Sequence, residues 1–180
     1  MRHVVESWMQ SKPIMIRPIG YVHTSYSDIE VSQSWPRGVS GYIEILPEYL
    51  DGLRGLEDFS HVIILAWLHK VTEENRHVLK VRYRRLTRAG INLEELPEVG
   101  VFTSDSPHRP NPLAVTIARV REVKGNIIQV DGLDLYDGTP VLDLRAYTPS
   151  YSIKDFTIPP WYQRLLEKVD RWRGQRSSSP

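Results

Sequence analysis

The chain is organised around one stretch of sequence, Gly100-Val101-Phe102-Thr103-Ser104-Asp105-Ser106-Pro107-His108-Arg109-Pro110-Asn111-Pro112. Its three prolines fix φ at each ring and push the residue before each of them toward extended geometry. The stretch is therefore neither a helix nor a central strand, and it predicts a stiff loop with polar side chains in nearly fixed directions. A binding site needs such preorganisation, because ordering a floppy loop on binding costs roughly 1–2 kcal/mol per residue. The alternative is a rigid connection that merely carries polar residues.

Short apolar runs separated by turns extend outward from this loop on both sides. They predict β-strands at residues 14–22, 39–45, 61–69, 114–123, 127–130 and 141–147. Turns are expected at residues 124–126, where Gly125 and Asn126 supply positive φ, and at residues 131–132 and 137–140. Strands joined by turns rather than by crossover helices predict a mainly β fold, a single closed or nearly closed β-barrel with short helices. The Gly-rich turn of a doubly wound dinucleotide fold is absent from the sequence.

Three segments between the strands have patterns of their own. Residues 25–41 predict a long loop, and residues 46–56 predict a short helix or turn. Residues 77–86 alternate between apolar and basic side chains, which predicts a strand with Lys80, Arg82 and Arg84 on one face. Two interpretations of this basic face stay open. It is either a solvated edge strand protected by its charges or a stripe that contacts phosphates.

The pattern changes in the C-terminal part of the chain. Apolar residues recur at helical spacing after Pro160 and predict one amphipathic helix, with Trp161, Leu165, Leu166, Val169 and Trp172 on its apolar face. Residues 173–180 predict a disordered tail. We therefore divide the chain into an N-terminal extension (residues 1–13), a β-barrel domain (residues 14–150) and a C-terminal helix and tail (residues 151–180).

Composition limits the class of protein. The chain has 180 residues, of which 41% are hydrophobic and 25% charged, as in an ordinary globular domain. It contains no cysteine, which excludes disulfides and thiolate metal sites and agrees with a reducing cytoplasm. No apolar run approaches the roughly 20 residues of a membrane span, so we expect neither a signal peptide nor a membrane partner. The net charge is only +1, although basic residues cluster at 80–88 and 164–176.

The sequence gives little support to two other chemistries, a metal site and a serine hydrolase. Six histidines stand without a His-x-His or His-Glu-x-x-His pair and without a cysteine partner, so we predict no metal site. A hydrolase would take Ser104 or Ser106 as nucleophile, His108 as base and Asp105 or Asp143 as the orienting carboxylate. The chain has no Gly-x-Ser-x-Gly elbow, so the sequence does not favour this alternative.

Four motifs in register carry a resemblance to a known family. They are Ile-Gly-Tyr-Val-His-Thr at 19–24, Arg-Gly-Leu-Glu-Asp-Phe-Ser-His at 54–61, the stretch 100–112, and Leu-Asp-Leu-Tyr-Asp-Gly-Thr-Pro-Val-Leu-Asp at 133–143. Over about residues 16–150 the chain resembles the YaeB/TrmO (TsaA-like) family of tRNA N6-threonylcarbamoyladenosine methyltransferases, which use S-adenosylmethionine. The resemblance implies a β-barrel in place of the usual Rossmann-type scaffold. It also implies a homodimer whose cofactor sites are completed near the subunit interface.

The resemblance also assigns site residues. It implies cofactor contacts at Arg37, Gly38, Val39, His69, Lys70, Asp105 and Val115, in a pocket closed by Asp137, Gly138, Thr139 and Pro140. Two of these positions depart from the family, because Asp105 stands where a basic residue is usual and Ala114 replaces a glycine. Arg109 and Asn111 would hold the threonyl carboxylate, since a guanidinium matches a carboxylate bidentately. Asp143 and Tyr147 would orient the acceptor nitrogen, whose proton has to be drawn off.

The sequence therefore predicts a cytoplasmic, S-adenosylmethionine-dependent methyltransferase that acts on N6-threonylcarbamoyladenosine at position 37 of tRNA. The alternative is a non-catalytic or retargeted relative that binds the cofactor or RNA without this reaction. The proline-rich stretch at residues 104–112 is here called the proline loop. Methyl transfer at this site requires the proline loop and the turn at 137–140 to meet across a closed sheet and to line one cavity.

Overall fold

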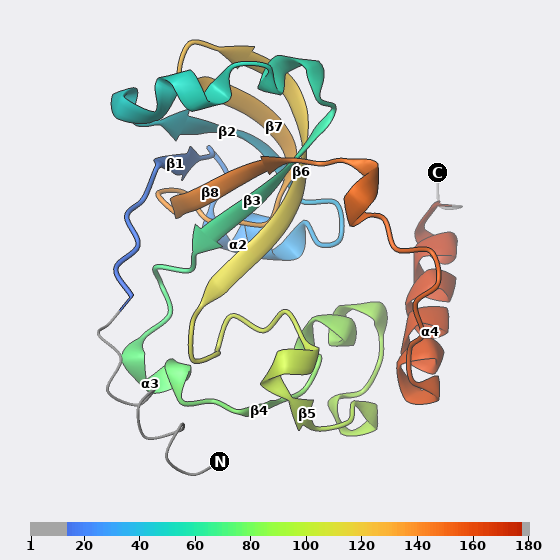
Figure 1. The fold of residues 1–180 in the computed structure, drawn as a ribbon. Coiled ribbons are helices and arrows are strands. Elements are labelled where there is room, and N and C mark those ends of the chain that lie inside the picture. The colour runs from blue at the N-terminus through green and yellow to red at the C-terminus, as the bar shows by residue number, and fades with distance from the viewer. Residues whose placement is uncertain (1–13, 178–180) are drawn as a thin grey trace.

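Six antiparallel strands close into a barrel in the computed structural model, which describes residues 14–177 (Figure 1). The strands are β1 (Gly20–His23), β2 (Val39–Ile45), β3 (His61–Trp67), β6 (Leu113–Lys124), β7 (Ile127–Leu133) and β8 (Pro140–Ala146). Around the barrel their order is β1-β2-β7-β6-β3-β8, and a short pairing of β8 with β1 closes the ring. The predicted mainly β fold with a closed barrel is confirmed.

Alternation along the strands fills the barrel with apolar side chains. In β3, Val62, Ile64 and Ala66 are fully buried, and Ile63 on the opposite face is nearly so. This agrees with the buried strand that the apolar run predicts. The same core includes residues from the other strands: Val22, Ile43, Ile45, Ala118, Ile128, Val130, Leu133 and Val141. Each buried Val, Leu or Ile side chain contributes about 1.5–3 kcal/mol, so this core fixes the strand ends from which a site can be built.

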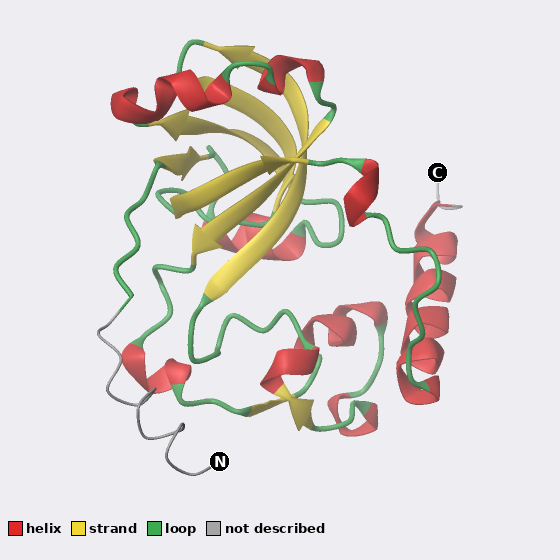
Figure 2. Ribbon diagram, viewed as in Figure 1, coloured by secondary structure: helices red, strands yellow, loops and turns green. Residues whose placement is uncertain are grey.

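The chain between β3 and β6 forms a small lobe beside one end of the barrel (Figures 1 and 2). The lobe contains α3 (Glu73–Arg76), the paired strands β4 (Lys80–Val81) and β5 (Val99–Gly100), and 3₁₀-helices at Arg84–Ala89, Leu93–Glu95 and Val101–Thr103. Its core of Leu86, Ile91 and Leu96 also receives Leu165 and Val169 from helix α4 (Pro160–Ser177). The predicted C-terminal amphipathic helix is thus confirmed, and its apolar face packs on the lobe.

A short helix interrupts the segment that was predicted as a long loop at residues 25–41. Helix α2 (Asp28–Gln33) begins with a capping box, in which the Glu30 carboxylate accepts from the backbone N–H of Ser27 at 2.8 Å. Val31 anchors the helix because its side chain is buried in the barrel core. The remaining short helices are 3₁₀ turns at Pro47–Leu53, where a helix or turn was predicted, Leu56–Asp58 and Pro149–Tyr151.

The strand predicted at residues 77–86 is wrong. Only Lys80–Val81 pairs with another strand, and the chain then winds into the 3₁₀-helix Arg84–Ala89. The helix forms because Leu86 is buried with Ile91 and Leu96, a contact between distant positions that local alternation does not reveal. The edge strand does not describe this segment as a whole, and contact of its basic side chains with phosphates stays a prediction.

Other element boundaries differ from the sequence-based expectation. The first strand begins at Gly20 rather than at residue 14, and the turn expected at 131–132 lies inside β7, where Gly132 (φ +90°) is the extra residue of a bulge opposite β2. In the hairpin, Gly125 has positive φ and Asn126 does not. Helix α4 continues to Ser177, so a disordered tail from residue 173 is wrong. Residues 178–180 and the predicted extension 1–13 lie outside the described residues.

Candidate functional site

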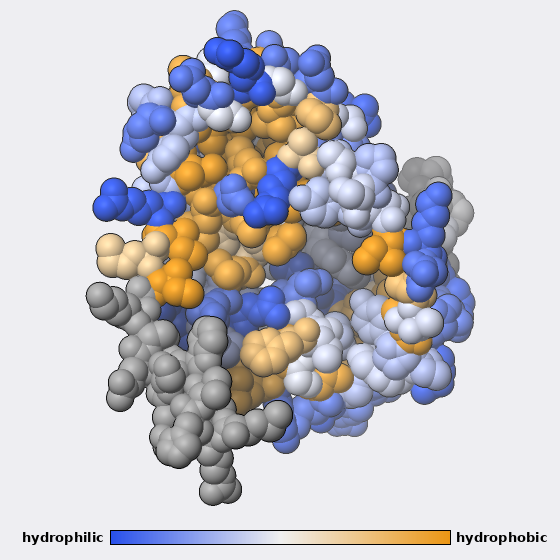
Figure 3. All heavy atoms as spheres, in the orientation of Figure 1, coloured by the Kyte–Doolittle hydropathy of each residue, from blue (hydrophilic) through white to orange (hydrophobic). Residues whose placement is uncertain are grey.

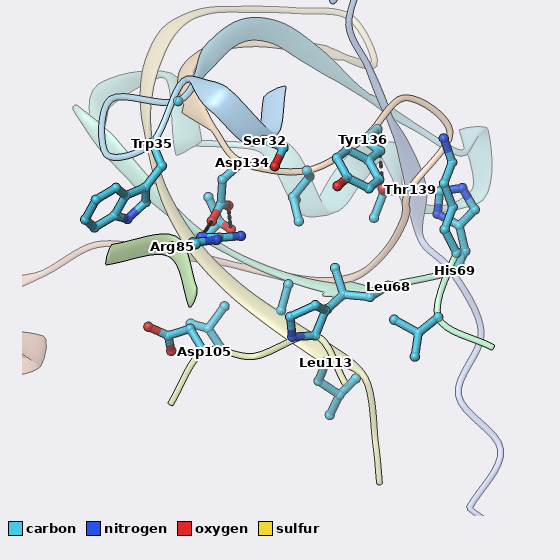
Figure 4. Close-up of a pocket in the computed structure, with 18 of the residues that line it drawn as sticks. Ser32, Trp35, Leu68, His69, Arg85, Asp105, Leu113, Asp134, Tyr136 and Thr139 are labelled. Carbon is cyan, nitrogen blue, oxygen red and sulfur yellow. Dashed lines mark hydrogen bonds and ion pairs between the residues drawn. The ribbon is translucent and has the colours of Figure 1, made fainter. Parts of the chain in front are cut away.

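A cavity of about 540 Å³ lies where the barrel meets the lobe (Figure 4). Its wall is made by α2 and the turn after it, the segment that follows β3, the proline loop, the first part of β6, and the segment between β7 and β8. The proline loop contributes Asp105 to the wall, and the turn at 137–140 contributes Thr139. These two segments therefore meet at one hollow, whose volume lies in the range of small-molecule pockets.

Hydrogen bonds within the proline loop hold it in shape. The Ser104 hydroxyl donates to the Val101 carbonyl at 3.0 Å and accepts from the Ser106 N–H at 3.3 Å. Nη2 of the half-buried Arg109 donates to the carbonyls of Ser104 and Val101 at 3.1 and 3.4 Å. A guanidinium has five N–H donors, so the donors on Nε and Nη1, for which residues 14–177 provide no hydrogen-bond partner, can serve a ligand.

A fixed carboxylate stands on the opposite wall. The hydroxyl of the buried Thr116 donates to Oδ1 of Asp134 at 2.6 Å, and Nη1 of Arg85 lies 3.8 Å from Oδ2 of the same residue. Figure 4 shows the side chains of Arg85 and Asp134 pointing toward one another at the cavity wall. The side chains come from β6, the β7–β8 segment and the lobe, so this network forms only when all three are in place.

His69 and Lys70 follow β3 and reach the cavity from its end. The Lys70 ammonium contacts both carboxylate oxygens of Asp28, at 2.7 and 2.6 Å, and lies 5.1 Å from the centre of the Tyr136 ring. Burial, and then the charge of Lys70, lower the pKa of His69 below its ordinary value, although Asp28 and Asp137 partly oppose this. His69 is therefore a neutral imidazole at neutral pH.

The turn after α2 approaches β7 so closely that it requires glycine. Gly38 has φ +72°, and a Cβ at this position would lie 2.4 Å from the Gly132 carbonyl carbon and 2.7 Å from the Leu133 oxygen. This approach brings Trp35 and Pro36 onto the cavity wall.

The turn at 137–140 forms as predicted, with Gly138 at φ +72°. An Asp137 carboxylate oxygen accepts from the Thr24 N–H at 3.0 Å, which ties the turn to the segment that follows β1. Thr139 is buried, donates its hydroxyl proton to the Tyr136 carbonyl at 2.7 Å and lines the cavity. Asp137 is thus engaged in holding the turn, and Thr139 is the member of the turn that reaches the hollow.

The residues assigned from the sequence fall into three groups. Seven line the cavity: Gly38, His69, Lys70, Asp105, Arg109, Val115 and Thr139. Six flank these along the chain without lining it: Arg37, Val39, Asn111, Asp137, Gly138 and Pro140. Asp143 and Tyr147 do not line the cavity. Asp143 accepts a hydrogen bond from Arg145 Nε at 3.2 Å. The Tyr147 N–H donates to the carbonyl of His61, which lies at the end of β3 opposite His69. Within one chain the structure does not bring these two residues to the cavity.

Several lining residues were not singled out from the sequence. They include Ser32, Trp35, Leu68, Arg85, Leu113, Asp134 and Tyr136. Arg85 was placed on the strand predicted at residues 77–86 and Asp134 in the motif at 133–143, and nothing in the local sequence relates the two. For Trp35 a signal existed, because it stands three residues before the family-assigned Gly38.

A closed antiparallel barrel with a cavity of mixed charge at one end defines a ligand-binding β-barrel protein, distinct from the doubly wound nucleotide-binding class. The chain belongs to the family of the tRNA-methyltransferase O N-terminal domain, whose family model matches residues 21–153. The resemblance found in the four sequence motifs is confirmed by this match.

Individual relatives agree with the family. A probable S-adenosyl-L-methionine-binding protein of Pyrococcus abyssi is 31% identical over 166 residues, covering 89% of this chain and 84% of the relative. The tRNA (adenine(37)-N6)-methyltransferase of Homo sapiens is 32% identical over 87% of this chain, which spans only 35% of that protein's length. Crystal structures of TrmO, one of them from Pseudomonas aeruginosa, superpose with TM-scores of 0.61 and 0.58 at 28% and 25% identity. They cover 83% of this chain, which in turn spans 66% and 65% of them.

The described part of the chain, residues 14–177, offers neither a membrane-spanning helix nor a metal site. None of its helices is both long and apolar enough to cross a membrane. Between residues 14 and 177, no three His, Asp or Glu side chains gather in a way that could hold a metal ion.

Proposed function

We propose that this chain transfers the methyl group of S-adenosylmethionine to N6 of adenine 37 in tRNA, where the acceptor is N6-threonylcarbamoyladenosine. The observation that supports this most strongly is a single cavity lined by both the proline loop and the 137–140 turn in a chain of this family. Relatives named as S-adenosyl-L-methionine-binding proteins and as tRNA (adenine(37)-N6)-methyltransferases support the donor and the acceptor. An enzyme with this substrate is expected in the cytoplasm, with the tRNA pool.

The residues of the cavity fit S-adenosylmethionine, which carries a sulfonium, an ammonium and a carboxylate. Asp105 and Asp134 offer acceptors to the two cationic groups, and Lys70 offers a donor to the carboxylate. An apolar wall suited to an adenine ring is made by Leu68, Leu113, Ala114 and Val115. Bound there, the cofactor would supply a methyl group that is already activated.

With an activated methyl group, the chain's own residues have to align the acceptor and exclude water. The proline loop is ordered by its own hydrogen bonds, so it presents Arg109 with little further loss of conformational entropy. We assign the guanidinium of Arg109 to the threonyl carboxylate, with Asn111 beside it at the rim. Asp143 and Tyr147 could act on the acceptor only from a second subunit, because neither reaches the cavity of its own chain.

The decisive experiment supplies the protein with S-adenosylmethionine and tRNA that carries N6-threonylcarbamoyladenosine, and then measures the nucleosides by mass spectrometry. We expect the N6-methylated nucleoside to appear. Binding of both substrates without this product would instead select the retargeted relative. The carboxylate of Asp105, at a position where the family usually has a basic residue, favours that second candidate.

The neutral imidazole of His69 leads to a pH dependence of cofactor binding. Because folding lowers the pKa of His69, protons bind the unfolded chain more readily than the folded one. The contribution of neutral His69 to the free energy of unfolding is therefore complete above the ordinary histidine pKa of about 6.5. It is lost as the pH falls below that value. Protonation would also place a second cation beside Lys70, and repulsion between the two would displace the ammonium that receives the cofactor's carboxylate. We therefore expect the Kd for S-adenosylmethionine, measured by calorimetry, to be flat above about pH 6.5 and to rise below it. In a His69→Asn variant the acid rise should disappear, and an equal rise in both proteins would assign it to another group.

We further propose that the chain acts as a homodimer through the outer face of β3 and β6. Val115 and Ile117 on this face are 71% and 52% exposed, and Figure 3 shows apolar side chains gathered over this side of the barrel. Val115 also lines the cavity, so a second copy seated on this face would cover the mouth of the site.

Replacing Ile117 with Glu tests the dimer. A charge in the middle of an apolar interface is strongly unfavourable, so we expect size-exclusion chromatography with light scattering to shift from dimer to monomer. The matched control is Ile153→Glu, because Ile153 is 68% exposed but lies outside β3 and β6. An Ile117→Glu variant that stays dimeric would show that the copies meet elsewhere.

A further inference from the structure

A second cavity, of about 660 Å³, adjoins the one already described. It is bounded by the 3₁₀-helix Arg84–Ala89, by β4, by the proline loop and by helix α4. Five residues line both cavities: Trp35, Arg85, Asp105, Pro107 and His108. The two hollows therefore share a wall, and that wall includes the proline loop.

Aromatic rings form one part of this second cavity. The rings of Tyr83 and Tyr162 lie 5.6 Å apart between centroids, and Trp35 is a third lining ring. The Tyr83 hydroxyl donates to the carbonyl of Thr103, which fixes this ring. Burial, and then the neighbouring Tyr83 and Asp105, raise the pKa of Tyr162, so its phenol stays uncharged at physiological pH.

Basic side chains form the other part. Lys80, Arg82, Arg84 and Arg85 all line the cavity. Arg82 is engaged with the carbonyl of Leu96 at 2.6 Å, and Lys80 lies 3.5 Å from Glu98. The exposed guanidinium of Arg84 forms no ion pair with any residue in 14–177, so its charge is available to a ligand.

Rings for stacking beside unpaired positive charge are the features that bind single-stranded nucleic acid. The position of this cavity points to the same ligand. Methyl transfer requires the acceptor nitrogen and the methyl carbon to approach within roughly 3–3.5 Å, so the acceptor base has to occupy space next to the donor. The second cavity is such a space, because it begins at the wall that it shares with the first.

We propose that the second cavity receives the single-stranded RNA around the acceptor, with a base stacked on Tyr162 and a phosphate against Arg84. This inference rests on the proposed function, which places the methyl donor in the first cavity. It gives helix α4 a role in holding the RNA, because Tyr162 belongs to this helix and its Leu165 and Val169 fix the helix on the lobe. Tyr162 and Arg84 line the second cavity but not the first, so they can hold the RNA without contacting the donor.

Two variants test the proposal on the full chain. The probe is a fluorescent anticodon stem-loop RNA that carries N6-threonylcarbamoyladenosine, and S-adenosylmethionine binding is measured in parallel. For Tyr162→Leu we expect the Kd for RNA to rise about tenfold, whereas Tyr162→Phe, which keeps the ring, should retain the affinity. For Arg84→Gln we expect a Kd about threefold to tenfold higher and a salt dependence reduced by about one phosphate contact. The Kd for S-adenosylmethionine should stay within about twofold in all three.

The controls separate this proposal from the proposed function. Arg164→Gln removes the same charge from an exposed position of α4 that lines neither cavity, and it should leave RNA affinity unchanged. RNA affinity that is unchanged in Tyr162→Leu and Arg84→Gln, with normal melting temperatures, would overturn the proposal and leave an acidic protein partner as the ligand. A wild-type chain that binds the RNA through these residues but does not methylate it would overturn the proposed function alone. Methylation with an unaltered KM for tRNA in both variants would overturn the proposal alone.

Discussion

A Gly38→Ala variant is expected to lose at least about 3 kcal/mol of unfolding free energy. Two effects add at this position. Alanine at φ +72° is strained by roughly 1–3 kcal/mol, and its methyl group would overlap backbone atoms of Gly132 and Leu133, which costs a similar amount because a backbone has to move. For a chain of this size the loss corresponds to a melting temperature lowered by roughly 6–12 °C, which calorimetry or thermal circular dichroism would measure.

Gly90→Ala is the matched control for this variant. Gly90 has almost the same conformation, φ +75°, but no atom lies within 4 Å of the Cβ that would be added. It therefore suffers the conformational strain without the overlap, and its melting temperature should fall by much less. An equal fall in the two variants would mean that the turn after α2 can move away from β7. The wall that carries Trp35 would then be mobile.

The second large effect is expected at Arg109. An Arg109→Ala variant should raise the KM for tRNA carrying N6-threonylcarbamoyladenosine by about tenfold or more, the scale of 1.4 kcal/mol, because the guanidinium that pairs with the threonyl carboxylate is lost. Steady-state kinetics at saturating S-adenosylmethionine would show it. Arg109→Lys keeps the charge but not the fork of donors, and should recover only part of the loss.

A higher KM in Arg109→Ala could also come from a structural role of this side chain. Arg109 also donates to the carbonyls of Ser104 and Val101, so the alanine variant loosens the proline loop. A loosened loop would weaken every RNA to the same extent. Loss of a carboxylate contact would weaken only RNA that carries the threonylcarbamoyl group. Wild-type protein should therefore prefer the modified stem-loop over the unmodified one, and Arg109→Ala should bind both alike. A preference that survives the substitution would remove this role from Arg109.

The barrel strands could be predicted because their signals are local. In β3 an uninterrupted apolar run around Ile63 and Ile64 corresponds to a strand covered on both faces. The hairpin between β6 and β7 is marked by Gly125, the residue that takes positive φ. Helix α2 was missed although the capping pair Ser27 and Glu30 was visible, because the segment was judged by its loop-forming residues.

The lobe and part of the site could not be predicted, because they depend on contacts between distant positions. The alternation at residues 77–86 resembles a strand, but burial of Leu86 against Ile91 and Leu96 overrides it. The pairing of Arg85 with Asp134 and the sharing of a wall by two cavities arise only in the folded chain. The family resemblance identified the proline loop and the turn at 137–140, but not which side chain of each faces the hollow.

The short β1–β8 pairing that closes the barrel, here called the seam, affects how the protein folds during its synthesis. Among the barrel strands β1 is synthesised first and its partner β8 last, and the two pair at Gly20 with Val141 and at Tyr21 with Pro140. Adjacent strands such as β6 and β7 can pair early, whereas contacts so far apart in sequence form late. Since Thr139 stands next to this seam and lines the first cavity, the wall of that cavity is complete only when the last barrel strand, β8, has been made.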